Sequence, residues 1–133
     1  MGELLQPWRG QRLQPAHLTR ASLPLALVEV RVPAPSAQML EDLCDPARLA
    51  ATSNGPDAIA SRSRDVTQPI ARAAWKAGHH GLRWWSSFWG EWHTVVLFTK
   101  RLSGTLGFGE PGVLTVDHPA VTEAASLLGM ATR

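Results

Sequence analysis

The sequence predicts a small α+β domain with packed helices, and three stretches of the chain lead to this prediction. Residues 81–98 hold four of the six tryptophans and the most apolar run of the chain, a composition typical of strands. Residues 67–78 and 119–130 carry apolar side chains at helical spacing, each with a proline early and a glycine near the end. At 133 residues, the chain is long enough for one core, so a single domain over residues 1–133 is expected.

The tryptophan-rich stretch is interpreted as two strands joined by an aromatic loop. Residues 81–85 and 94–98 are rich in aromatic, β-branched and long apolar side chains, and the residues between them include Ser86 and Gly90, which favour a turn. The run 95–98 does not alternate with polar residues. The second strand is therefore predicted to be an interior strand, covered on both faces.

Shorter elements are predicted from their cap and turn residues. Asp45 followed by Pro46 indicates the cap and first turn of a helix over residues 46–51. A last strand is expected at residues 114–116. The glycines of residues 104–109 indicate a flexible loop, because the Lys-Ser/Thr pair that follows a phosphate-binding loop is missing.

Composition and charge exclude several classes of protein. Thirteen Lys and Arg residues against eleven Asp and Glu residues leave a small positive excess, spread along the chain, so direct binding to nucleic acid is not expected. Cys44 is the one cysteine, which fits a reducing compartment. Neither a signal peptide nor a membrane-spanning window is present, so a cytoplasmic protein without membrane contact is expected. Adjacent His79 and His80 point apart on most backbones, and no metal site is expected.

The same aromatic stretch resembles a known protein family. The pattern Gly81-Leu82-x-Trp84-x-Ser86, followed by a short loop and an apolar strand ending in Leu-Phe, is similar to the C-terminal signature of the RES family. Residues 36–130 resemble such a protein well and residues 1–35 only loosely, which indicates a shortened N-terminal part.

The resemblance implies a fold and an activity. RES proteins are bacterial toxins or related enzymes, usually paired with an Xre-like antitoxin protein, that break down NAD or transfer its ADP-ribosyl group. Their mixed β-sheet and crossing helices resemble the ADP-ribosyltransferase core. NAD is accordingly the expected substrate, and an Xre-like antitoxin is the expected partner.

The resemblance also implies residues that bind NAD. The hexapeptide Gly-Gln-Arg-Leu-Gln-Pro around Arg12 is similar to the family's Gly-x-Arg-Trp-x-Pro, whose arginine lies in the NAD pocket. An arginine can hold a pyrophosphate through two hydrogen bonds. Ser86 matches the family serine and would bond to the nicotinamide-ribose part of NAD or orient the glutamate. Trp84 is one of several tryptophans able to stack on a nicotinamide or adenine ring.

Glu29 has two interpretations, and both stay open at the level of sequence. If Ser22 caps a short helix, Glu29 matches the essential glutamate of the family, and Leu18 then stands where the family has a tyrosine. The chain contains no tyrosine, and His17 is the nearest polar ring. Alternatively, valines alternate with charged residues over residues 25–32, which predicts a strand with Glu29 pointing to water.

Cleavage of the bond between nicotinamide and ribose passes through a ribosyl oxocarbenium ion. Such an enzyme has to fix the dinucleotide and place negative charge near the developing cation. Glu29 and Ser86 are the candidate catalytic residues, with Arg12, His17 and Trp84 as candidates for binding NAD. The predicted function is a RES-type NAD glycohydrolase, NAD phosphorylase or ADP-ribosyltransferase. The alternative is a truncated or degenerate member that serves as a binding module.

Overall fold

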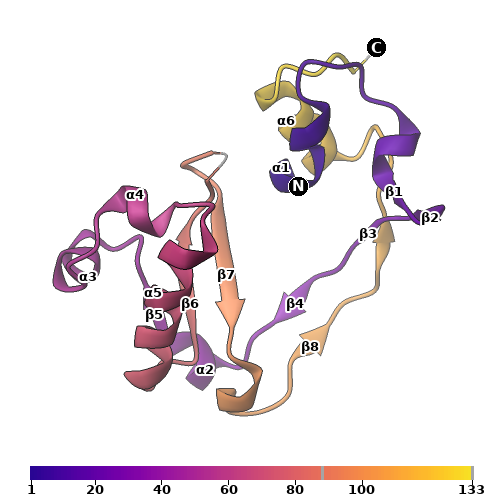
Figure 1. Ribbon diagram of the computed structural model, residues 1–133. Helices are drawn as coiled ribbons and strands as arrows, with labels where there is room; N and C mark the ends of the chain where they lie inside the picture. Colours follow the sequence, from indigo (N-terminus) through magenta and orange to yellow (C-terminus); the bar gives the residue numbers. More distant parts are fainter. Residues whose placement is uncertain (88, 133) are drawn as a thin grey trace. The chain divides into compact units, whose positions relative to one another are not determined.

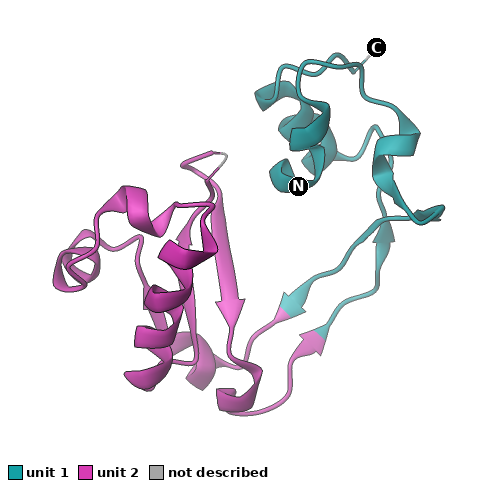
Figure 2. Ribbon diagram, viewed as in Figure 1, with its two compact units in different colours: residues 1–30, 108–133 teal, residues 31–107 magenta. Residues whose placement is uncertain are grey.

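The structure is a computed structural model that describes residues 1–87 and 89–132, and it divides into two compact units (Figure 2). Unit 1 consists of Met1–Val30 and Phe108–Arg133, and unit 2 consists of Arg31–Gly107. Helices and strands occur in both units (Figure 1), which confirms the α+β class. Residue 88 of the predicted aromatic loop lies outside the described residues.

Unit 2 is built on a three-stranded sheet with the order β5-β6-β7. Strand β5 (Leu40–Asp42) runs parallel to β6 (Gly81–Trp85), and β6 runs antiparallel to β7 (His93–Leu97). The sheet is therefore mixed, as the resemblance implied. The bounds of β6 agree with the prediction, and β7 begins and ends one residue earlier than predicted.

The prediction that residues 95–98 form an interior strand was wrong. Among the described residues of this sheet, β7 is an outer strand and β6 lies between its two neighbours. Val95 and Val96 are 46% and 39% exposed. The residues of this apolar run have two different roles. Val95 and Val96 belong to the strand, whereas Phe98 lies beyond it and packs against the core of unit 2, where its ring meets Trp75 edge to face.

Helix α5 (Arg64–Lys76) packs against β6 and closes the core of unit 2 (Figure 1). The buried side chains of this core are Leu43, Ile59, Ala74 and Leu82. The helix begins after Ser63, three residues before the helical pattern predicted over residues 67–78. Pro69 thus lies inside the helix, where it is tolerated because the carbonyl it leaves without a donor belongs to exposed Asp65 and can bond to water.

Short helices and a turn complete unit 2. They are α2 (Ala34–Gln38), α3 (Pro46–Ala51), α4 (Pro56–Ile59) and η3 (Thr99–Arg101). The predicted helix after Asp45 is confirmed at both ends. The carboxylate of Asp45 accepts the backbone N–H of Ala47 at 2.8 Å, which is the expected N-cap interaction.

Ser36 fastens two loops to the core of unit 2. Its hydroxyl is completely buried, accepts the backbone N–H of Ser103 at 2.7 Å and lies 3.2 Å from Nδ1 of His80. We expect Ser36→Ala to lower the free energy of unfolding by about 1–3 kcal/mol, because the backbone N–H of Ser103 and the ring of His80 lose their partner in a partly buried place. Urea denaturation measures this change. An unaltered unfolding midpoint would mean that water replaces the hydroxyl.

Unit 1 packs its N-terminal and C-terminal helices together. Helix α1 (Gly2–Leu5) contacts α6 (Pro119–Leu127), and their contact buries Leu5, Val121, Ala124 and Ala125 completely. The terminal helix was predicted correctly in place and in its buried face, although it ends at Leu127. The other elements of the unit's first segment are η1 (Gln6–Trp8), η2 (Pro15–Leu18), β1 (Thr19–Arg20) and β2 (Leu23–Pro24).

The remaining strands are two residues long. Strand β3 (Ala26–Leu27) pairs with β9 (Gly112–Val113), and β4 (Val30–Arg31) pairs with β8 (Gly107–Phe108). The last strand was predicted two residues too late, at residues 114–116. The observed strand is β9, and the chain after it turns toward the N-cap of α6.

Candidate functional site

The predicted site residues are divided between the two units. Arg12, His17 and Glu29 belong to unit 1, whereas Trp84 and Ser86 belong to unit 2. Each group is described within its own unit. Four of the five residues lie outside the long helices and the three-stranded sheet, and Trp84 lies in β6.

Glu29 lies in an extended segment between β3 and β4 and is exposed. The helix that the family match required over residues 22–28 is absent: Ser22 has a left-handed backbone (φ 63°) in the turn between β1 and β2, so it does not cap a helix. The carbonyl of Glu29 accepts the backbone N–H of Gly109 at 2.9 Å. A Cβ at Gly109 would lie 3.2 Å from that of Glu29, so the missing side chain is what permits this close pairing.

Arg12 is held by its backbone and exposes its side chain. It forms an isolated parallel bridge with Ala131, and the N–H of the next residue, buried Leu13, donates to the carbonyl of Ala131 at 2.8 Å. The guanidinium is thus carried on an anchored loop at the surface of unit 1. An exposed guanidinium can bind an anion through its planar fork of N–H donors.

The ring of His17 makes two contacts within unit 1. Its ring stacks on Trp8 with centroids 4.3 Å apart and planes 11° from parallel, and its Nδ1 accepts the N–H of Gln14 at 3.3 Å. Nδ1 is therefore an acceptor and Nε2 carries the proton of the neutral ring. Leu18, which stands in place of the family tyrosine, is 3% exposed and belongs to the core of this unit.

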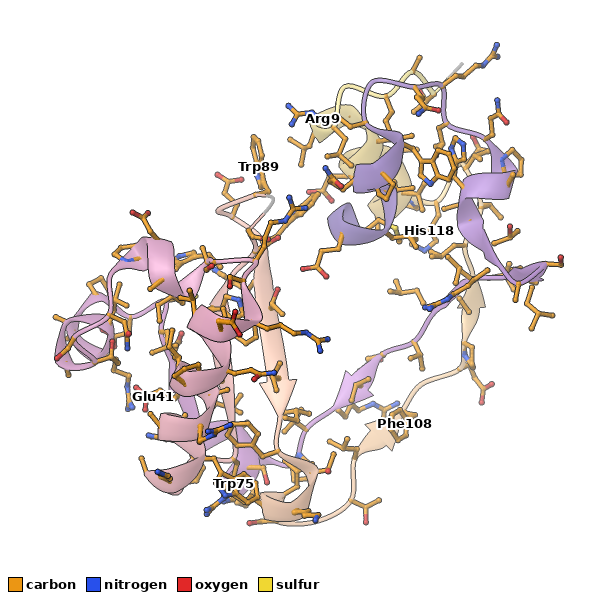
Figure 3. All side chains as sticks on the ribbon, viewed as in Figure 1. Arg9, Glu41, Trp75, Trp89, Phe108 and His118 are labelled. Atoms are coloured by element: carbon orange, nitrogen blue, oxygen red, sulfur yellow. The ribbon has the colours of Figure 1, made fainter. Side chains whose placement is uncertain are left out.

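Ser86 is the first residue after β6 and begins the loop to β7. Its backbone N–H donates to the carbonyl of Trp92 at 2.7 Å, which closes the loop at its base. Trp84 packs against the core of unit 2, so only part of its ring is accessible. Trp89 is 39% exposed and lies near the tip of the loop (Figure 3), where it is the better placed tryptophan for stacking on a ligand.

A chain of polar side chains crosses the sheet next to Ser86, and it was missed at the level of sequence. Arg83 donates from Nη1 to the Asp42 carboxylate at 2.8 Å, and its Nη2 lies 2.9 Å from Nδ1 of His93. The three residues come from β5, β6 and β7. The alternation of Arg83 with apolar neighbours was visible, but its partners are 41 and 10 residues away and only the strand register identifies them.

A cavity of about 370 Å³ lies on the opposite face of the sheet, between α3 and α5. Glu41 lies in its wall (Figure 3), where its carboxylate contacts Nε2 of His79 and forms an ion pair with Arg48, whose Nη1 lies 3.6 Å away. Apolar side chains such as Leu43 and Leu82 form much of the remaining wall. None of the five predicted residues lines this cavity. Among residues 1–87 and 89–132, no group of three or more His, Cys, Asp or Glu side chains could hold a metal ion.

Cys44 lies two residues after Asp42, and the pKa of its thiol is affected by the charges of Asp42 and Arg83. Burial and the neighbouring Asp42 carboxylate raise the pKa of the Cys44 thiol, and the more distant Arg83 opposes this only in part. Because the thiolate is the nucleophile, we expect iodoacetamide to alkylate Cys44 more slowly than glutathione at pH 8. Asp42→Asn should lower the thiol pKa and speed the reaction. A rate for the unmodified protein at or above that of glutathione would contradict this assignment.

Comparison with known families identifies the chain. A family model, described as RES domain, matches residues 1–111. The chain belongs to the RES family. The matched range includes all five candidate residues, from Arg12 to Ser86. Neither a curated protein nor a solved structure was found to match this RES protein. In the described part of the chain, no helix has both the length and the apolar character needed to cross a membrane.

Proposed function

We propose that this RES protein cleaves the nicotinamide-ribosyl bond of NAD, as a glycohydrolase, phosphorylase or ADP-ribosyltransferase, and that it is a bacterial toxin. The observation that carries the proposal is the family match over residues 1–111, because RES proteins are generally toxin-related proteins that act on NAD. The acceptor of the ribosyl group is water, phosphate or a protein.

The proposed reaction needs little covalent help from the protein, because nicotinamide leaves from a ring that is already cationic. Glu29 supplies the negative charge that favours the ribosyl oxocarbenium ion, or holds the ribose hydroxyls. Ser86 bonds to the nicotinamide-ribose part or orients the Glu29 carboxylate. Arg12 binds the pyrophosphate through its planar fork, with His17 and Trp84 as further contacts to the dinucleotide.

The backbones of Glu29 and Ser86 are each held by a hydrogen bond within their own unit, to Gly109 at 2.9 Å and to Trp92 at 2.7 Å. The proposed partner is an Xre-like antitoxin protein, and the proposed place of action is the cytoplasm, where a toxin of this kind meets NAD.

A second candidate is a degenerate member of the family that binds a partner without turning over NAD. Leu18 favours it, since an apolar side chain that is 3% exposed cannot donate the hydrogen bond expected of a tyrosine in the NAD pocket.

The release of nicotinamide separates the two candidates. Purified protein is incubated with NAD, and free nicotinamide is followed by proton NMR for the unmodified chain, Glu29→Ala and Ser86→Ala. The enzyme proposal expects release by the unmodified chain and strong loss in both variants. If the unmodified protein releases none, the binding module is the correct alternative. Release that neither substitution affects would remove both residues from the catalytic assignment.

A further inference from the structure

We propose that Arg83, held by Asp42, positions His93 to donate a hydrogen bond to a pyrophosphate oxygen of the dinucleotide. This inference rests on the proposed action on NAD and adds His93 as a ligand-binding residue and Arg83 as a positioning residue. Neither belongs to the set predicted from the sequence.

The geometry fixes which nitrogen of His93 carries the proton. An arginine side chain is always charged and can only donate hydrogen bonds. Because Nη2 of Arg83 lies 2.9 Å from Nδ1 of His93, Nδ1 has to be the acceptor, and the proton of the neutral ring is on Nε2. The Asp42 carboxylate, 2.8 Å from Nη1, holds the guanidinium in this orientation.

The register of the sheet places His93 at the same end as Ser86. His93 is the partner of Trp85 across the β6–β7 pair, and Ser86 is the next residue. The hydrogen bond from Ser86 N–H to the Trp92 carbonyl joins the two strands at this point. The Nε2–H of His93 is consequently a fixed donor beside the loop that carries the proposed catalytic serine.

The chain formed by Asp42, Arg83 and His93 is expected to contribute little to the stability of the fold. The side chains of Arg83 and Asp42 are 39% and 34% exposed, and ion pairs at such exposure contribute little to folding. The exposed His93 side chain buries little apolar surface. Asp42 also accepts the backbone N–H of Cys44 at 3.0 Å, and Arg83 orients the one N–H donor of the neutral His93 ring. A donor held in place binds an anionic oxygen with less loss of entropy than a mobile one.

The tautomer is tested first, without any ligand. Long-range proton–nitrogen NMR spectra of the unmodified protein at pH 8 should show His93 with its proton on Nε2. In Arg83→Met, which removes the N–H donors of the guanidinium, the spectra should show a mixture of the two tautomers. A mixture in the unmodified protein would overturn the positioning role of Arg83, and this holds whether or not the protein acts on NAD.

Binding is tested with two ligands by isothermal titration calorimetry. ADP-ribose carries the pyrophosphate, and nicotinamide riboside lacks it. His93→Leu should raise the Kd for ADP-ribose about tenfold and leave that for nicotinamide riboside unchanged, because one hydrogen bond to a charged group is lost. His93→Gln, which retains an N–H donor, should restore most of the affinity, and Thr94→Val is the control in the same strand.

The outcomes separate this inference from the proposed function. Equal ADP-ribose affinities of His93→Leu and the unmodified protein, together with nicotinamide release from NAD, would overturn the role of His93 and keep the function. ADP-ribose binding that depends on His93 without nicotinamide release would support the inference and reject the catalytic function. A protein that binds neither ligand contradicts both. Equal weakening of both ligands would overturn the contact to the pyrophosphate.

Discussion

Replacing Gly81 with alanine is expected to lower the free energy of unfolding of unit 2 by at least about 3 kcal/mol. A Cβ at this position would overlap the backbone oxygen of Val96 and lie 2.8 Å from Cδ2 of Leu40. The overlap involves a backbone atom of the paired strand, so a change of rotamer cannot relieve it. The sheet has to open at the β6–β7 pair, which also carries Ser86 and His93.

Gly90→Ala is the matched control for this prediction. A Cβ there meets no atom within 4 Å, and the backbone is not left-handed, so unfolding in urea should be nearly unchanged. Circular dichroism and tryptophan fluorescence measure both variants. Equal midpoints for Gly81→Ala and Gly90→Ala would show that β6 and β7 do not pair as closely as described.

Glu29→Gln is expected to reduce the rate of nicotinamide release about a hundredfold or more, with little change in stability. The substitution retains the size of the side chain and one acceptor oxygen but removes the negative charge that the proposed function places near the oxocarbenium ion. Glu29 is exposed, and its backbone carbonyl accepts the N–H of Gly109, a hydrogen bond that the substitution leaves intact. The loss should therefore appear in kcat more than in the KM for NAD.

Glu110→Gln provides the control, because Glu110 is another exposed glutamate of unit 1. It should leave the rate of nicotinamide release unchanged. If both substitutions lower the rate equally, the effect comes from the net charge of the unit, and Glu29 has no special role.

Local patterns were enough to predict much of unit 2. The bounds of β6 followed from a short apolar run closed by glycine and serine, and α3 followed from the Asp-Pro pair at its start. The position of β7 at the outside of the sheet could not be predicted, because an apolar run such as 95–98 fits an interior strand and also a strand followed by a core aromatic residue.

Unit 1 was harder to predict because its strands are two residues long and depend on distant partners. Strand β3 pairs with residues that follow it by more than eighty positions in sequence, and the local spacing of apolar residues cannot predict such a pairing. The cap expected at Ser22 competes with a left-handed turn at Ala21 and Ser22. The strand interpretation of residues 25–32 was closer, since Glu29 lies in extended backbone.

The candidate site depended on the resemblance for its residues and on the structure for their surroundings. Ser86 was located correctly at the end of β6, but its place beside the Asp42–Arg83–His93 chain required the register of three strands. The cavity at Glu41 was not predicted at all, because its wall combines residues from α3, α5 and β5.

The central proposal, which rests on the resemblance to the RES family, is that Glu29 and Ser86 act together on one molecule of NAD. A double-mutant cycle tests it most directly, with nicotinamide release measured for the unmodified protein, Glu29→Gln, Ser86→Ala and the double variant. Residues that act as one unit are strongly non-additive, so we expect the double variant to be about as slow as the slower single variant. A rate reduced by the product of the two single effects would mean that the two residues act independently, and it would contradict the claim.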